Sequence, residues 1–143
     1  RVILLFGMWR AIFFGLCFCC VVCWCCVRVL TAWLKMLGPD ADKLNIVFVS
    51  VDPERDTPEQ LRLYLSNFDA RIQGFTGTPD AVAKAAKAYR VYYQKVPQDG
   101  GGYTIDHSSS VYLFDAKGQF VAPIAYQSPP DRALNQLRAL LAG

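Results

Sequence analysis

The sequence predicts an α/β protein in which helices flank a central mixed sheet. The stretch "NIVFVSV" at 45–51 is apolar almost throughout, which is typical of a strand covered on both faces. Two Thr-Pro pairs, at 57–58 and 78–79, each begin a run with helical spacing. From Ser110, "SVYLFDAKGQFVAPIAY" indicates a hairpin. Because hairpin strands are antiparallel and strands joined through helices are parallel, the sheet is expected to contain both pairings.

The first elements are a strand, a helix and a second strand. "AIFFGL" (Ala11–Leu16) predicts the first strand, and "VLTAWLKMLG" (Val29–Gly38) predicts the last turns of a helix. Gly38 and Pro39 are expected to end this helix, because glycine suits a left-handed residue and proline cannot continue the helix. The strand at 45–51 follows, so the crossover helix predicts a parallel pair.

Two helices and a further strand are expected in the middle of the chain. A helix from Pro58 to about Asn67 begins at Thr57, and Gln60 completes a capping box. A second, alanine-rich helix runs from Pro79 to about Tyr89. The residues that follow, "VYYQKV" (Val91–Val96), predict a strand.

The remainder of the chain is expected to form a flexible loop, a hairpin and a last helix. "PQDGGG" (97–102) predicts the loop. The hairpin strands, 110–114 and 119–126, are joined by a turn in which Gly118 suits the left-handed position. Ser128 is expected to cap the last helix, with Pro129 at its first position. One face of that helix carries Leu134, Leu137 and Leu141.

The resulting order, β-α-β-α-α-β-β-β-α, is the plan of a thioredoxin-like fold. At 143 residues the chain has the length of one domain, so a single domain over 1–143 is predicted. In this fold the chemistry lies where the first strand meets the first helix. A formal charge of +3 is too small to indicate nucleic-acid binding.

Residues 1–30 differ in character from the remainder. From Arg1 to Ala32 the only ionisable side chains besides cysteine are three arginines. The uncharged run from Ala11 to Val27 lies at the short limit for a membrane-spanning helix, which is one alternative. A buried strand followed by a helix is the second alternative, which composition leaves equally open, and a misassigned segment before Thr31 is the third. If Ala11–Leu16 is a strand, it cannot span a bilayer, and any tether lies before Arg1.

All six cysteines lie within "CFCCVVCWCC", from Cys17 to Cys26. At the start of a helix, the dipole and unpaired N–H groups favour a thiolate. Cys19 and Cys23 form a C-x-x-x-C pair, which places both sulfurs on one helical face. Cys20 with Cys23, and Cys23 with Cys26, form C-x-x-C pairs. Spacing alone does not select among them, and any such pair can form a disulfide or bind a metal ion.

The chain has one histidine, His107, in "YTIDHSSSVYLF" between the glycine-rich loop and the hairpin. One interpretation is a solvated loop histidine. The other is a third metal ligand, on a loop that folds over the cysteines. Two thiolates and one imidazole suit Cu(I) and also serve Cu(II), whereas zinc usually takes a fourth ligand.

Three stretches together resemble the SCO/SenC family of membrane-tethered, thioredoxin-fold copper proteins. They are "VFVSVDPERDTPEQLRLYLSNFDARIQGFTGTPD", "AYRVYYQKV" and "YTIDHSSSVYLFDAKGQF", and the resemblance runs from about Thr31 to the C-terminus. The family binds copper through a C-x-x-x-C pair and a distal histidine. "FFGLCFCCVVC" aligns with the family pattern so that Cys19, Cys23 and His107 match these ligands. The prolines, threonines and aspartate that flank the family's cysteines are replaced here, and the chain upstream is shorter than in the family.

The resemblance implies a metallochaperone for the dinuclear copper centre of cytochrome c oxidase, with Cu(I) or Cu(II) bound. The implied partner is the copper-bearing subunit of the oxidase or another copper chaperone. The alternative is an enzyme, a metal-independent thiol-disulfide oxidoreductase in which Cys19 and Cys23 are the redox pair and His107 is dispensable. The expected location is the bacterial periplasm, with a tether to the inner membrane.

Two other groups of residues have both a functional and a structural interpretation. "DPERD" (52–56) follows a predicted strand, at the end where sites of α/β proteins gather. Its aspartates equally suit turn and helix capping. Tyr92, Tyr93 and Tyr103 can form a partner surface or simply pack a half-buried sheet.

Overall fold

A computed structural model describes residues 9–15, 21–107, 110–125 and 127–143, with side chains from Cys25 onward. Five strands form the main sheet in the order β3-β2-β1-β6-β7. The first three, β1 (Trp9–Gly15), β2 (Leu44–Ser50) and β3 (Ile72–Phe75), are parallel. The other two, β6 (Ser110–Phe114) and β7 (Phe120–Ala125), are antiparallel to their neighbours. The predicted mixed sheet is therefore confirmed.

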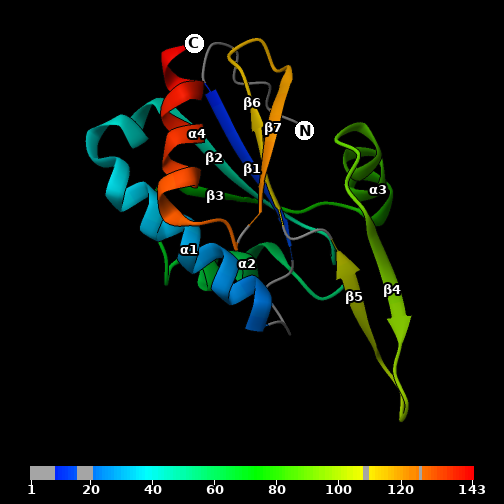
Figure 1. Ribbon diagram of the computed structural model, residues 1–143. Coiled ribbons are helices and arrows are strands. Elements are labelled where there is room, and N and C mark those ends of the chain that lie inside the picture. Colours follow the sequence, from blue (N-terminus) through cyan, green and yellow to red (C-terminus); the bar gives the residue numbers. More distant parts are fainter. Residues whose placement is uncertain (1–8, 16–20, 108–109, 126) are drawn as a thin grey trace.

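Four α-helices cover this sheet, with α1 and α4 on one side and α3 on the other (Figure 1). They are α1 (Val21–Leu37), α2 (Pro58–Leu65), α3 (Pro79–Ala88) and α4 (Pro130–Ala142). A 3-10 helix, η1 (Gly38–Lys43), follows α1, and Gly38 adopts the expected left-handed conformation with φ of 62°. The backbone N–H of Gln60 donates to Thr57 Oγ1 at 3.2 Å, which is one half of the predicted capping box. The Thr57 backbone N–H donates instead to the Arg55 carbonyl at 3.2 Å.

The two faces of β2 contribute to two separate hydrophobic clusters, because side chains alternate along a strand. Ile46 and Phe48 belong to the larger cluster, together with Trp33 and Leu34 of α1 and Leu137 of α4. On the other face, Val47 and Val49 pack against a smaller cluster of Val51, Ala86, Val91, Ile105 and Phe114. This double burial explains why β2 is apolar almost throughout.

A second, two-stranded sheet projects from the body of the protein (Figure 1). It consists of β4 (Tyr93–Pro97) and β5 (Tyr103–His107), which are antiparallel. Gly100, Gly101 and Gly102 in the connecting loop have φ values of 89°, 98° and 83°, which explains the glycines at the tip.

Several sequence predictions need correction. The expected order omitted β3 and β5. Ser128 does not cap α4: Pro129 is its N-cap residue, and the helix starts at Pro130 without a side-chain cap. The membrane-helix alternative for Ala11–Val27 is also wrong, because its first residues lie in β1, hydrogen-bonded between β2 and β6. Among the residues that the structure describes, no helix is long and apolar enough to cross a membrane.

Candidate metal centre

The strand register places the end of β1, which leads to the cysteine segment, and the start of β6, which follows His107, at one edge of the sheet. Phe13 in β1 pairs with Val111 in β6, and the two strands run in opposite directions. The chain that leaves β1 toward the cysteines therefore starts at the edge where the chain enters β6 from His107. Gly15, the last residue of β1, also pairs with Ser50, the last residue of β2. This edge holds the carboxyl ends of the parallel strands, where sites in α/β proteins gather.

Of the two predicted cysteine ligands, the structure describes the backbone of Cys23 but does not describe Cys19. Cys23 is the third residue of α1, and no acidic residue lies in the first turn of that helix. The first turn of a helix is its positive end, a backbone position that in general favours a thiolate. Cys19 lies outside the described residues, as do Cys17 and Cys20. Among the described residues alone, no group of three or more His, Cys, Asp or Glu side chains could hold a metal ion.

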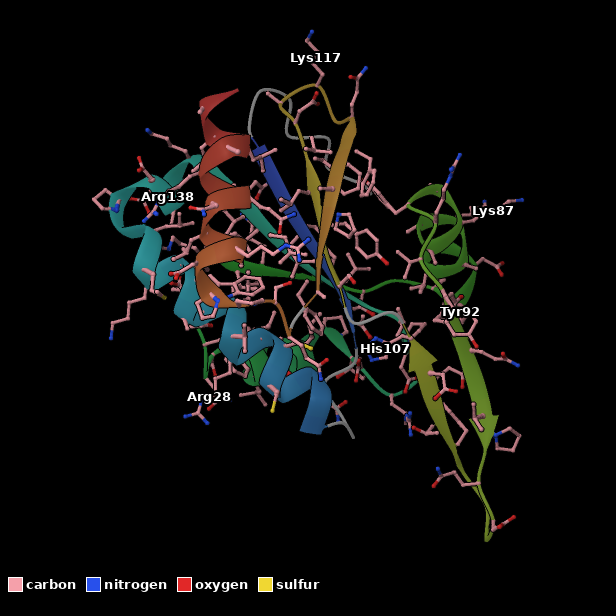
Figure 2. The ribbon with its side chains drawn as sticks, viewed as in Figure 1. Arg28, Lys87, Tyr92, His107, Lys117 and Arg138 are labelled. Carbon is pink, nitrogen blue, oxygen red and sulfur yellow. The ribbon has the colours of Figure 1, made fainter. Side chains whose placement is uncertain are left out.

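His107 is the last residue of β5, not a loop residue as predicted. It pairs in register with Tyr93 of β4, and its side chain is half-buried. Figure 2 shows it where the hairpin meets the body of the protein, away from the glycine-rich tip. The backbone of His107 is therefore held by strand pairing, which is a stiffer support than the mobile loop that the sequence suggested.

Two further cysteines are described on α1. Cys26 is 3% exposed and belongs to the large hydrophobic cluster, whereas Cys25 is half-buried. A sulfur packed among apolar side chains is poorly placed for exchange with a soluble ligand or target. Of the pairs that spacing left open, Cys23 with Cys26 is thus the least suited to a functional site.

The "DPERD" loop after β2 forms a buried polar network. Ser50 Oγ donates to Asp56 Oδ2 at 2.5 Å and accepts from the Asp52 backbone N–H at 3.1 Å. Asp52 and Asp56 are 1% and 0% exposed. Arg55 Nε donates to Asp52 Oδ2, which neutralises that buried carboxylate. The N-cap of α2 is Thr57, so Asp56 does not cap that helix with its side chain.

This network reaches across to the β4–β5 hairpin through Tyr103. The Tyr103 hydroxyl donates to Asp52 Oδ1 at 2.8 Å, and Arg55 Nη1 donates to the Tyr103 carbonyl at 3.0 Å. Burial, with a smaller effect from the hydrogen bond to Asp52, raises the pKa of Tyr103 to about 12. On the outer side, Lys95 Nζ lies 2.8 Å from Glu54 Oε1 and holds the pKa of Glu54 below its usual value.

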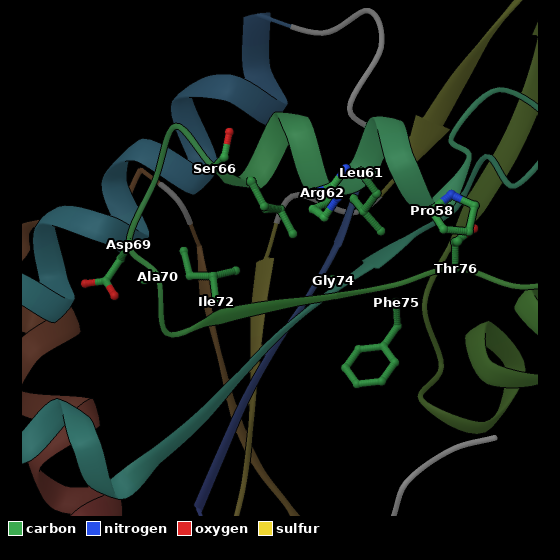
Figure 3. A pocket seen from close by; sticks show the side chains of 11 residues that line it. Pro58, Leu61, Arg62, Ser66, Asp69, Ala70, Ile72, Gly74, Phe75 and Thr76 are labelled. Carbon is green, nitrogen blue, oxygen red and sulfur yellow. The ribbon is translucent and has the colours of Figure 1, made fainter.

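A groove of 590 Å³ lies elsewhere, between α2 and β3 (Figure 3). Apolar side chains such as Leu61, Leu65 and Phe75 line it, with Arg62 and Asp69 among the polar residues. Gly74 leaves room for α2, because a Cβ there would lie 2.6 Å from Leu65 Cδ1. The lining contains neither cysteine nor histidine, so the groove does not suit a soft metal ion.

Comparison with known proteins agrees with the fold and the motifs. The family model described as SCO1/SenC matches residues 4–142. The chain belongs to the SCO1/SenC family. Its thioredoxin-like fold is likewise that of the Sco structures: a Bradyrhizobium japonicum ScoI structure with copper bound is 43% identical, with a TM-score of 0.86 over 95% of this chain and 87% of that one. Yeast Sco1 with copper bound is 34% identical, with a TM-score of 0.86 over 96% and 78% of the two chains.

Curated SCO relatives are longer than this chain. The mitochondrial protein SCO1 homolog 2 of Arabidopsis thaliana is 41% identical over 73% of this chain and 41% of its own length. The mitochondrial SCO2 of Saccharomyces cerevisiae is 36% identical over 92% of this chain and 45% of its own length. The chain thus spans less than half the length of these two SCO proteins.

Sequence reasoning did not find the contact between Tyr103 and the buried Asp52. Both residues stood out separately, Asp52 in the charged loop and Tyr103 among the strand tyrosines. For two of the three tyrosines the packing interpretation holds, because Tyr93 and Tyr103 pack against the smaller hydrophobic cluster. Tyr92 is 56% exposed, so it does not share that role.

Proposed function

We propose that this SCO-family chain binds one copper ion through Cys19, Cys23 and His107. It delivers the ion during assembly of the dinuclear copper centre of cytochrome c oxidase. The observation that supports the proposal is the register of β1 between β2 and β6, because the chain leaves β1 toward the cysteines at the edge where it enters β6 after His107. Copper-bound structures of relatives at 43% and 34% identity support the choice of metal.

The chemistry of the donors fits Cu(I) transport. Two thiolates are soft ligands that select Cu(I), and an imidazole also suits copper. A partner that offers similar donors can therefore exchange copper with this set of ligands. Cys23 at the first turn of α1 has the helix dipole to stabilise its thiolate. His107 approaches from a different sheet, so the site combines two independently supported parts of the fold.

An anaerobic Cu(I) titration of the reduced protein against a competing chelator tests the binding site. The expected result is one tight equivalent, at least about tenfold weaker in His107→Ala, which is about 1.4 kcal/mol. A Cys19→Ser, Cys23→Ser double variant is expected to lose tight binding. Cys25→Ser is the matched control, because it removes a half-buried thiol from the same helix without touching a proposed ligand. Several loose equivalents that ignore His107→Ala would contradict the proposal.

The position of Cys23 also supports a second candidate, a metal-independent thiol-disulfide oxidoreductase. A thiolate at a helix N-terminus is reactive toward disulfides as well as toward metals. The two functions differ in their need for His107. If His107→Ala reduces a disulfide target as fast as the unsubstituted protein and copper has no effect, the redox function is favoured.

The proposed location is the bacterial periplasm, with the domain tethered to the inner membrane. The proposed partner is the copper-bearing subunit of the oxidase or another copper chaperone. The 43% identity to a bacterial ScoI supports a bacterial source, although the first curated relatives are named as mitochondrial. Fractionation of the expressing cells, with alkylation of periplasmic thiols in intact cells, tests this placement.

A further inference from the structure

We propose that Tyr103 is a positioning residue for His107, and that its contacts with the body of the protein set the copper affinity of the site. This inference rests on the proposed function for its copper readout. Its structural part concerns the metal-free protein and can be tested separately.

The β4–β5 hairpin needs such an anchor because it is not part of the main sheet. Its two strands hydrogen-bond to each other and form a sheet of their own. A two-stranded hairpin is only marginally stable alone, so its orientation depends on contacts with the body of the protein. His107 ends β5 at the base of the hairpin, and Tyr103 begins the same strand next to the glycine-rich loop.

Tyr103 makes the polar contacts that join β5 to the end of β2. Its hydroxyl donates to Asp52 Oδ1 at 2.8 Å, and its carbonyl accepts from Arg55 Nη1 at 3.0 Å. The Arg55 guanidinium carbon also lies 4.1 Å from the centre of the tyrosine ring. Asp52 is 1% exposed, so this hydrogen bond is shielded from competing water.

The anchor at the other strand of the hairpin is weaker. Lys95 Nζ lies 2.8 Å from Glu54 Oε1 and 4.5 Å from the centre of the Tyr103 ring. Both side chains of this ion pair are about half exposed, at 49% and 51%. Exposed pairs of this kind contribute little, because water and salt screen them. Of these two contacts, the one through Tyr103 is therefore the stronger.

Strand geometry connects the anchor to the histidine. Side chains two and four positions apart share a face of a strand, so Tyr103, Ile105 and His107 point to the same side. Ile105 is 6% exposed and belongs to the smaller cluster with Val51, so this is the side that faces the body. Fixing Tyr103 on Asp52 therefore fixes the side on which His107 is presented, about 13 Å along the strand.

A loosened hairpin is expected to lower the apparent affinity for copper. If the hairpin loosens from the body of the protein, only a fraction of the molecules present His107 correctly, and the apparent affinity falls by that fraction. A change in the tyrosine hydroxyl can thus weaken copper binding without touching a ligand. The effect must vanish when His107 is absent, because no imidazole then remains to be positioned.

The test compares Tyr103→Phe with Tyr92→Phe. The control removes the same atom from a tyrosine whose hydroxyl donates to Gln94 Oε1 at 3.0 Å on the exposed side of the hairpin region. Because the chain has one histidine, histidine-labelled protein gives a single imidazole spin system in NMR. Tyr103→Phe is expected to shift and broaden the His107 signals of the reduced, metal-free protein, and Tyr92→Phe to leave them unchanged.

Copper affinity supplies the second readout. Tyr103→Phe is expected to weaken Cu(I) binding about five- to tenfold, and to have no further effect in the His107→Ala background. Arg55→Lys keeps the charge but not the donor geometry, and is expected to reproduce the effect if Tyr103→Phe folds poorly.

Unchanged His107 signals in Tyr103→Phe, or an affinity loss that persists in the His107→Ala background, would overturn the inference. Failure of the proposed function looks different. In that case no variant or parent binds copper tightly, whereas the metal-free NMR comparison still decides whether Tyr103 positions His107.

Discussion

Replacing Ser50 by alanine tests whether the end of β2 depends on its buried polar network. Ser50 and Asp56 are both 0% exposed. The substitution removes the hydroxyl that donates to Asp56 Oδ2 at 2.5 Å and accepts from the Asp52 backbone N–H at 3.1 Å. The two hydrophobic clusters on either side of β2 are left intact.

The expected loss of stability follows from these two hydrogen bonds. A hydrogen bond to a charged group contributes about 1.5–3 kcal/mol, and a buried N–H without its acceptor costs about 1–3 kcal/mol. Because Asp56 has other contacts, the lower part of the combined range applies, about 3 kcal/mol. With a urea dependence of about 2 kcal/mol per molar, the midpoint of unfolding should fall by about 1.5 M.

Urea unfolding of the reduced protein, followed by tryptophan fluorescence, measures this change. Ser66→Ala is the matched control, because the Ser66 hydroxyl donates to the Leu63 carbonyl at 2.6 Å on the exposed end of α2. That variant should change the unfolding free energy by less than about 0.5 kcal/mol. If Ser50→Ala costs no more than Ser66→Ala, the reasoning from the buried network is refuted.

Gly74→Ala should destabilise the protein by about 1–3 kcal/mol, because its Cβ would lie 2.6 Å from Leu65 Cδ1 and 2.9 Å from Leu61 Cγ. In a double-mutant cycle of urea unfolding, Gly74→Ala should cost less unfolding free energy when Leu65→Ala is also present. Strictly additive costs would contradict a steric clash between the new Cβ and Leu65. Arg71, hydrogen-bonded at 2.8 Å, lowers the pKa of Asp69 below its ordinary value of 3.8. The ionised Asp69 carboxylate therefore stabilises the folded protein fully above pH about 3.8, and this stabilisation is lost as the pH falls through the lower folded-state pKa of Asp69. The stability difference between the parent and Asp69→Asn should shrink over that acidic window, and a constant difference would contradict the assignment.

The elements that the sequence predicted well have local signals. The capped start of α2 at Thr57 and the apolar run of β2 depend on residues that are adjacent in the chain. By contrast, β3 is a four-residue edge strand, "IQGF", with one buried residue, so its apolar pattern is too short to be recognised. The sequence of β5 is also short, and its partner β4 lies across a glycine-rich loop, so its pairing depends on tertiary structure.

The candidate site divides in the same way. Cys19, Cys23 and His107 were selected by resemblance to a family pattern, because the cysteine spacing left several pairs open. The burial of Cys26 removes one of those pairs from serious consideration, and only the fold could show this. The anchor between Asp52 and Tyr103 joins residues 51 positions apart, so no local pattern could reveal it.

Copper transfer is the most direct test of the central claim. The chain loaded with one Cu(I) is mixed anaerobically with the reduced, metal-free copper domain of a cytochrome c oxidase subunit. Copper on each protein and reduced thiols on this chain are then counted. The account predicts that copper moves to the oxidase domain, that the thiols of this chain stay reduced, and that His107→Ala is defective. Retention of copper, together with copper-independent reduction of a disulfide form of that domain, would contradict copper delivery and favour the redox function.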